Sequence, residues 1–294
     1  MKLIKQSFEI LDQQCGLEGI YKHIEIAGRT CYKSEDKITE DSAKEFVDRM
    51  IKSGHGAMLE HGTVYLAIPI SEWRCTDDYR DSYISNPYSN VNDSLVDWEN
   101  NEGTVYITTN LRVLVENGWL DDLKYICEPT EHHEKRITVK FITDQGILRE
   151  FTRHRVFSFA VESTRYCNYS KNRFSHEITF IQPNWISDED VKDYHINYNY
   201  FIDQDNNHIT AVNRFMSALK NAEYFYMELI KLGWKPQQAR NILPLATKCD
   251  MIMTGFVSDW KHFFELRDAA SAHPQAQELA HSLHETFIQR GLVE

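Results

Sequence analysis

The segment R-E-F-T-R-H-R-V-F-S-F-A-V-E-S-T-R-Y, from Arg149 to Tyr166, concentrates positive charge in a chain whose formal net charge is −12. Apolar residues with helical spacing at its start predict a helix whose last turn carries Arg153, His154 and Arg155. Successive helical residues are about 100° apart, so the two arginines would point in nearly opposite directions. Guanidinium groups pair bidentately with phosphate or carboxylate, so two that point apart suit two separate anions. The alternative is that these cations only complement the dipole of that helix.

The spacing within this segment resembles the signature of flavin-dependent thymidylate synthases, which is Arg-His-Arg, seven residues, and then Ser-x-Arg-Tyr. Here the three parts of the signature are residues 153–155, 156–162 and 163–166. The pattern departs from the family at one place. The family's glutamate two residues before the serine is Val161 here, and Glu162 follows one position later. The sequence leaves open whether Glu162 replaces it.

The remaining sequence predicts an α+β fold, in which a mixed or antiparallel sheet is flanked by long helices. Strand-like patterns cover residues 62–70, 136–143 and 247–256. A helical stripe covers residues 41–54, and a longer one ends at Gly233. These elements surround the signature segment, so we expect them to form its scaffold.

Other stretches give weaker patterns. Residues 1–35 are expected to form short strands with a turn near Cys15, and residues 186–208 a surface connection. In the family, the first two predicted strands would be almost adjacent, whereas about 65 residues separate them here. The resemblance therefore implies a single domain over residues 1–294, with an atypical insertion of a strand and a helix at about 72–135.

Composition excludes several classes of protein. With 42% hydrophobic residues the chain can bury a sizeable core, and its acidic balance argues against a general nucleic-acid-binding protein. The sequence has no 18-residue apolar run, so we expect no membrane span, and its N-terminus does not have the pattern of a signal peptide. Six scattered cysteines without a C-x-x-C pair are typical of reduced thiols in a cytoplasmic protein, and no metal site is indicated.

The resemblance to the family implies two sets of site residues. Those implied for dUMP are Glu150, Arg153, Ser163, Thr164, Arg165, Arg240 and Arg267. Those implied for FAD are His55, Ala57, Glu60, Arg153, His154, Arg155, Ser258 and His262. Arg29 and Cys31 are implied to border the site. Ala57 replaces a usual Thr or Ser, and Phe256, Ser258 and His262 replace a usual Asn-x-Arg and Asn.

Arg267 is unusual by its pattern alone. Trp260, Phe263, Phe264 and Arg267 recur at i, i+3, i+4 and i+7 of a predicted helix, for which Ser258 is the expected N-cap. An arginine in register with an aromatic stripe is unexpected. It either extends to solvent, or it strengthens a charge-assisted hydrogen bond beside apolar surface. The resemblance implies that Arg267 is the catalytic residue, which pairs with the uracil edge and stabilises the charge that makes C5 nucleophilic.

The activity that the resemblance implies is the reductive methylation of dUMP to dTMP. Methylenetetrahydrofolate would donate the carbon, and FAD reduced by NADPH the hydride, in a homotetramer whose subunits share their sites. No G-x-G-x-x-G turn is present to hold a dinucleotide. The resemblance implies that the reaction needs no enzyme nucleophile, and in agreement with this no cysteine has the setting of an activated thiol. The alternatives are a cysteine-dependent thymidylate synthase and a flavin- or nucleotide-binding sensor without turnover.

Overall fold

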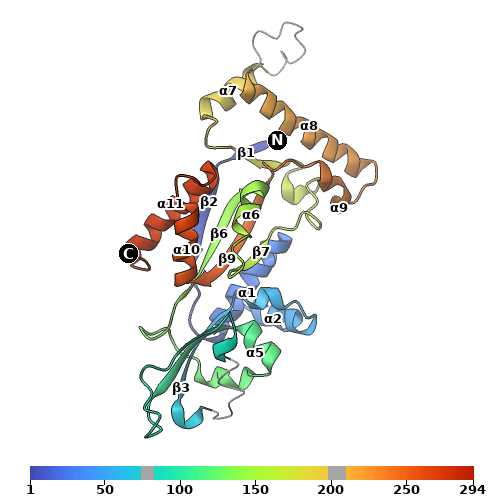
Figure 1. Cartoon of the computed structure of the whole chain (residues 1–294). Coiled ribbons are helices and arrows are strands. Elements are labelled where there is room, and N and C mark those ends of the chain that lie inside the picture. Colours follow the sequence, from blue (N-terminus) through green and yellow to red (C-terminus); the bar gives the residue numbers. More distant parts are fainter. Residues whose placement is uncertain (74–82, 198–209) are drawn as a thin grey trace.

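The computed structural model describes residues 1–73, 83–197 and 210–294. The molecule is elongated, with a four-stranded sheet at its centre, a three-stranded sheet at one end and a helical arm at the other (Figure 1). Helices and mainly antiparallel sheets make up this α+β fold, so the predicted fold class is confirmed.

The central sheet is antiparallel throughout. Its strand order is β2 (Ser7–Leu11), β6 (Arg136–Asp144), β9 (Lys248–Phe256) and β7 (Ser158–Val161). Strand β6 pairs with β9 along its whole length, from Arg136 opposite Phe256 to Asp144 opposite Lys248. Because successive side chains point to opposite faces of a sheet, β6 supplies mainly apolar residues, such as Val139 and Phe141, to one face and mainly polar residues to the other.

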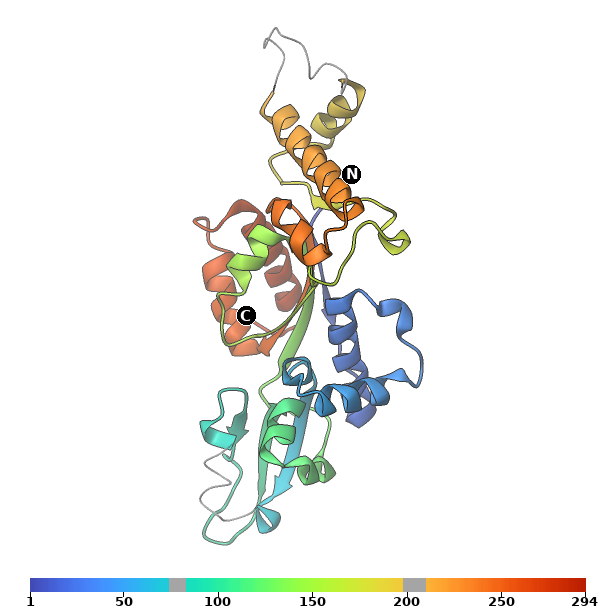
Figure 2. The ribbon, with the colours of Figure 1, turned by 90° about the vertical axis from the view of Figure 1, so that its right-hand side faces the viewer.

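Helices cover both faces of this sheet, as Figure 2 shows edge-on. Helices α10 (Val257–Arg267) and α11 (Pro274–Gln289) lie on one face, with the short α6 (Gln145–Phe151) beside them. Helix α1 (Gly16–Tyr32) lies on the other face, against β7 and β9. The sheet is therefore the middle layer of three.

The three-stranded sheet has the order β3 (Thr63–Pro69), β5 (Thr104–Asn110) and β4 (Asn90–Asn92), all antiparallel. Helix α5 (Leu111–Asn117) follows β5 directly, with Asn110 as its N-cap. Helix α2 (Ser42–Lys52) packs against α1 and contributes apolar side chains to the same region.

The helical arm begins at a two-stranded parallel pair. Strand β1 (Lys2–Ile4) pairs with β8 (Thr179–Ile181), and α7 (Asp188–Asn197), α8 (Ala211–Lys231) and α9 (Pro236–Ala239) extend from it (Figure 1). The remaining short elements are α3 (Gly56–Leu59), η1 (Glu35–Lys37), η2 (Ile70–Glu72), η3 (Leu120–Tyr125), η4 (Asn172–Phe174) and η7 (Arg240–Ile242).

Buried apolar side chains gather in three main clusters. The central core lies between the four-stranded sheet and α10 and α11, and includes Phe141 and Trp260. The lower core lies among α1, α2, β3 and β5, and includes Phe46 and Leu66. The arm core lies under α8 and includes Leu219. Each end of the molecule thus has its own apolar interior.

Most of the predicted elements are confirmed, within a few residues at their ends. The predicted strands at 62–70, 136–143 and 247–256 are β3, β6 and β9, and the long predicted helix is α8. The expectation for residues 1–35 is wrong in part, because α1 occupies 17 of them. Part of the predicted 186–208 connection is α7, and its residues 198–209 lie outside the described ranges.

None of the helices in the described part of the chain combines the length and the apolarity that a membrane crossing requires.

Candidate functional site

The Arg-His-Arg motif lies in a turn. Helix α6 ends at Phe151, and the backbone of Thr152 closes it by donating to Leu148 O at 3.0 Å. The prediction that residues 153–155 form the last turn of a helix is therefore wrong. The chain turns here because residues 158–161 must run antiparallel to β9 as strand β7. His154 is buried in this turn, whereas Arg153 and Arg155 on either side of it are exposed.

Arg267 joins the motif to helix α10. Its Nε donates to His154 Nε2 at 2.9 Å. Its Nη1 donates to Glu150 Oε2, and its Nη2 to the backbone oxygen of Glu150, each at 2.7 Å. The ring centroid of His262 lies 6.4 Å from that of His154. We call Glu150, His154, His262 and Arg267 the Arg267 cluster.

The electrostatics of the Arg267 cluster keep His154 neutral. Burial, and then the adjacent charge of Arg267, lower the pKa of His154 from 6.5 to about 4. The neutral ring carries one N–H, and the hydrogen bond donated by Arg267 to Nε2 places that proton on Nδ1. The sequence left open whether Arg267 extends to solvent or forms a charge-assisted hydrogen bond, and in the structure it forms the second with Glu150.

The guanidinium groups of Arg153 and Arg155 have no ion-pair partner among the described residues. Both are exposed, and neither forms a hydrogen bond or an ion pair with any other residue in the described ranges. Two free guanidinium groups on either side of a buried neutral histidine can bind anionic groups of a ligand.

A second group of predicted residues meets at the end of β7. Arg240 Nη1 donates to Thr164 Oγ1 at 3.1 Å, and the backbone N–H of Ser163 donates to Cys31 O at 2.9 Å. Arg165 is exposed, and its guanidinium carbon lies 5.5 Å from the ring centroid of Tyr166. We call residues 163–166 the signature loop. Helix α1, which ends at Tyr32, and the segment around Arg240 thus hold this loop from two sides.

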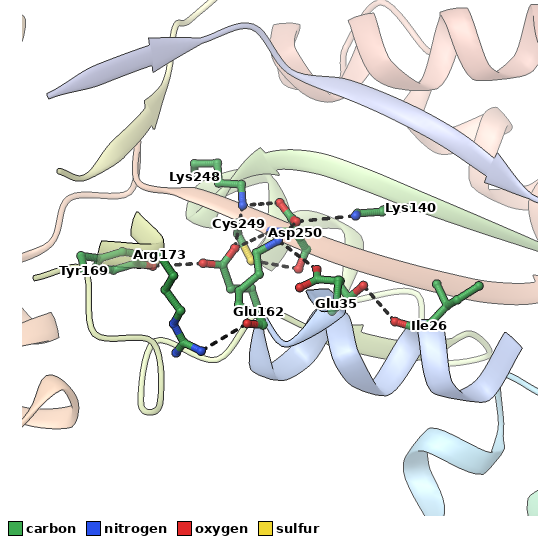
Figure 3. A network of polar contacts seen from close by, with 11 residues as sticks. Ile26, Glu35, Lys140, Glu162, Tyr169, Arg173, Lys248, Cys249 and Asp250 are labelled. Carbon is green, nitrogen blue, oxygen red and sulfur yellow. Dashed lines mark hydrogen bonds and ion pairs between the residues drawn. The ribbon is translucent and has the colours of Figure 1, made fainter. Parts of the chain in front are cut away.

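Glu162 points toward Tyr169 and Lys248 (Figure 3). Its Oε2 accepts from Lys248 Nζ at 2.8 Å and from the backbone N–H of Asp250 at 3.3 Å. Its Oε1 accepts from the hydroxyl of Tyr169 at 3.4 Å. The carboxylate is buried, and these contacts fix the start of the signature loop on β9.

Asp250 is the centre of the same network (Figure 3). Its carboxylate contacts the ammonium groups of Lys33 and Lys248, and Lys140 Nζ lies 3.8 Å away. These cations lower the pKa of Asp250 although burial alone would raise it. No motif signals this network, because its members come from four segments that lie far apart in the sequence. The only usable signal was a charge at an inward position of a buried strand.

The segment from His55 to Glu60 is divided between surface and interior. His55 and Ala57 are exposed at the start of α3, whereas Glu60 is buried and forms an ion pair with Arg112. Arg136 Nη1 also donates to the backbone oxygen of Glu60 at 3.0 Å. Sequence reasoning missed both of these arginines, which belong to no family motif.

Ser258 does not cap helix α10. The helix begins at Val257, its N-cap is Phe256, and Asp259 Oδ2 accepts from the backbone N–H of Phe256 at 3.1 Å. The predicted N-cap is therefore wrong, because the aspartate one residue further on supplies the capping carboxylate. Ser258 is exposed, and both its hydroxyl and its backbone N–H donate to Glu134.

The predicted residues thus form separate groups within one chain. Arg240 lies at the signature loop, and Arg267 lies at the Arg-His-Arg motif. No hydrogen bond or ion pair among the described residues joins these two groups directly. The described residues also contain no group of three or more His, Cys, Asp and Glu side chains placed to hold a metal ion.

Comparison with known proteins gives a family match over most of the chain. The model of the family described as thymidylate synthase complementing protein matches residues 99–290. A probable flavin-dependent thymidylate synthase of Paramecium bursaria Chlorella virus 1 is 27% identical over 152 residues, which are 52% of this chain and 66% of that protein. A flavin-dependent thymidylate synthase of Haloarcula marismortui is 25% identical over 166 residues, 53% of this chain and 64% of that protein.

The chain thus spans slightly less than two thirds of the length of these relatives. Among solved structures, a UMP/dUMP methylase, PolB from Streptomyces cacaoi bound with 5-Br dUMP, aligns with a TM-score of 0.42 and 17% identity. That alignment covers 100% of this chain and 99% of the other.

Proposed function

Because the chain belongs to the family of the thymidylate synthase complementing protein, we propose that it is a flavin-dependent thymidylate synthase, which methylates dUMP to dTMP. The observation that carries the proposal is the Arg267 cluster. It holds an arginine of helix α10 in a fixed orientation against the Arg-His-Arg motif. A guanidinium group fixed in this way can stabilise negative charge on a substrate without reorganising.

Arg267 has two N–H groups left for a substrate. Of its five donors, one is engaged by His154 and two by Glu150. The remaining N–H on Nη1 and the one on Nη2 would donate to O4 of uracil and to N3 in its deprotonated form. Negative charge stabilised at that edge raises the electron density at C5, which makes C5 the nucleophile.

The phosphate and sugar of dUMP would be held by other arginines and by two hydroxyl groups. We assign this role to Arg153, Ser163, Arg165 and Arg240, together with the hydroxyl of Thr164. Arg153 and Arg165 are exposed, and Arg240 is placed at the signature loop by its bond to Thr164. A phosphate that accepts from such guanidinium groups forms short charge-assisted hydrogen bonds.

The residues of the motif turn fit an anionic dinucleotide such as FAD. Arg153 and Arg155 are exposed and uncommitted, so they can pair with its phosphates, and His154 between them is neutral. His55, Ala57, Glu60, Ser258 and His262 complete the FAD set that the family implies. When bound, FAD reduced by NADPH supplies the hydride that completes the methyl group carried from methylenetetrahydrofolate.

The thiols support a reaction without a cysteine nucleophile. Burial raises the pKa of Cys167 to about 12, and the pKa of Cys249 is raised further by burial and by Glu162. Burial also raises the pKa values of Cys15, Cys31 and Cys127. A thiol becomes a nucleophile as the thiolate, and none of these five environments favours that form. Cys75 lies outside the described residues.

The second candidate function is a flavin- or nucleotide-binding sensor without turnover. It is favoured by Ser258 and His262, which stand where the family has flavin-binding side chains and which bond instead to Glu134 and Glu265 of the chain itself. Such a protein would bind ligands on the same scaffold and release none of the hydrogen at C5 of dUMP.

Tritium release from dUMP labelled at C5 tests the enzyme against both alternatives. With methylenetetrahydrofolate and NADPH present, the purified protein should release tritium and show the absorbance of FAD. Cys167→Ala and Cys249→Ala should retain activity. Flavin binding without tritium release would establish the sensor, and loss of activity in one of the cysteine variants would establish a cysteine nucleophile.

We further propose the organisation that the family implies. The chain would form one domain over residues 1–294, with residues 72–135 as an insertion. It would work in the cytoplasm as a homotetramer with shared sites, and would bind neither nucleic acid nor membrane.

A further inference from the structure

A cavity of about 540 Å³ lies at the end of the central sheet where β2 ends and β6 begins, between the start of α1, β3 and the segment after α11. Its size is that of a site for a small molecule. Apolar walls come from Ile20, Tyr65 and Ile137, among others. None of the residues assigned above to dUMP or FAD lines it.

The charge of Arg136 in this cavity is not balanced by the protein. Arg136 is 7% exposed and lines the cavity from the first position of β6. Its Nη1 donates to Glu60 O at 3.0 Å and to Thr63 Oγ1 at 3.4 Å, both uncharged acceptors. No ion pair among the described residues includes it. Its guanidinium carbon lies 5.6 Å from the ring centroid of Phe256.

Two carboxylates, those of Glu60 and Asp259, are close enough for their charges to act on Arg136, but both form their contacts with other groups. The carboxylate of Glu60 pairs with Arg112, and that of Asp259 accepts from the backbone of Phe256. Burial lowers the pKa of Arg136 to about 10, so the group is still a cation at neutral pH. A buried charge without a partner is costly, and a ligand anion would remove that cost.

The start of helix α1 favours the same kind of ligand. Gln14, Cys15 and Gly16 line the cavity, and Cys15 caps this 17-residue helix without a side-chain hydrogen bond. The first backbone N–H groups of a helix attract anions, and here they border the cavity that contains Arg136. The acidic residue in the lining, Asp12, is paired with Arg290 at 2.8 Å.

We propose that this cavity binds an anionic small molecule, whose carboxylate or phosphate pairs with Arg136 and whose aromatic or aliphatic part packs on Ile20, Tyr65 and Ile137. The site goes beyond the proposed function, because anion binding here does not require dUMP chemistry. Phosphate and carboxylate share the charge that Arg136 recognises, so two probes distinguish them.

The test is calorimetric titration of the purified protein, saturated with dUMP, with ADP as the phosphate probe and N-(4-aminobenzoyl)glutamate as the carboxylate probe. At least one probe should bind. Arg136→Met should weaken that binding about 10- to 100-fold, the value of a charge-assisted hydrogen bond. The matched control is Arg49→Met, which removes a guanidinium placed 5.3 Å from the ring centroid of Phe46 and outside the cavity, and it should leave binding unchanged.

The stability of the Arg136→Met variant distinguishes a ligand-binding role of Arg136 from a structural one. A purely structural role predicts that the variant is less stable than the parent. If Arg136 serves a ligand, Arg136→Met should leave the ligand-free protein as stable as the parent or more stable, because it removes an unpaired buried charge. A second variant, Cys15→Phe, fills the cavity without removing any contact of Arg136, and should also weaken binding. The proposal is overturned if neither probe binds, if both variants bind like the parent, or if Arg136→Met unfolds the protein while Cys15→Phe binds normally.

Discussion

Arg267 owes its orientation to residues from two distant segments. Helix α10 places Arg267 on the same side as Trp260 and Phe263. His154 and Glu150 then accept hydrogen bonds from three of its five N–H groups. The side chain is 13% exposed, so water competes little for the remaining donors. An arginine restrained in this way is suited to stabilising a developing charge, since little reorganisation is needed when the charge appears.

Replacing Arg267 by alanine should abolish turnover while flavin binding is retained. The loss of one preorganised charge donor typically lowers turnover about 100- to 1,000-fold. Tritium release from labelled dUMP measures the first effect and the flavin spectrum the second. Lys261→Ala, an exposed cation on the same helix, is the control and should be fully active. Full activity of Arg267→Ala would remove the proposed catalytic role.

His154 should make the protein sensitive to acid. Its pKa is about 4 in the folded protein against 6.5 for the free group, so the unfolded chain binds the proton first as the pH falls. This contribution to stability is complete above about pH 6.5 and is lost as the pH falls towards 4. At pH 5 the loss is about 2 kcal/mol. It should be visible in urea unfolding at pH 7 and pH 5.

The variant His154→Gln keeps an acceptor for Arg267 and should remove this part of the difference between the two pH values. His23→Gln should behave similarly, because burial lowers the pKa of His23 to about 4 as well. An unchanged difference in His154→Gln would show that His154 is protonated equally in both states.

Sequence reasoning found residues that belong to a spaced motif and missed those defined only by tertiary contacts. Arg153, Ser163 and Arg267 are recognisable from their neighbours in the chain. Asp250 and Arg136 are not, since their partners Lys33 and Glu60 lie far away in sequence and meet them only in the folded chain. No local sequence pattern specifies these tertiary contacts.

At the scale of elements, α1 is the helix that the sequence pattern did not predict. Its residues include three glycines and several β-branched side chains, all of which lower helix propensity. What makes it a helix is packing, because one side of it buries Ile20, Ile24 and Ala27 against the sheet and the lower core. Elements with strong periodicity, such as α8 and β9, could be predicted from their own sequence patterns without knowledge of tertiary contacts.

Gly28 permits the close approach of α1 and α2. A Cβ atom at this position would lie 2.4 Å from Phe46 Cζ, so Gly28→Ala should destabilise the fold by about 1–3 kcal/mol despite the better helix propensity of alanine. Denaturant unfolding measures the change. Combining it with Phe46→Leu makes room for the new methyl group, so the double variant should lose less than the two single losses together. Strict additivity, or a more stable Gly28→Ala, would contradict this packing.

At the scale of the whole molecule, the two separate groups of residues proposed for the nucleotide predict sites that are shared between subunits. Light scattering should then give a mass near four times the 34.6 kDa of one chain. Arg240→Ala and Arg267→Ala should each be inactive. Coexpressed, they should regain about a quarter of the parental sites, because a symmetric assembly pairs the intact arginine of one variant with that of the other. No recovery would place both arginines of a site in the same chain.

The separation of the apolar interior into a central, a lower and an arm core implies that the molecule does not open all at once. Units that share few buried contacts exchange their amide hydrogens through distinct local openings. Leu219→Ala in the arm should therefore speed exchange in α8 while the amides of β6 keep their protection. A melting curve followed by one probe would then report one end of the molecule and miss the other.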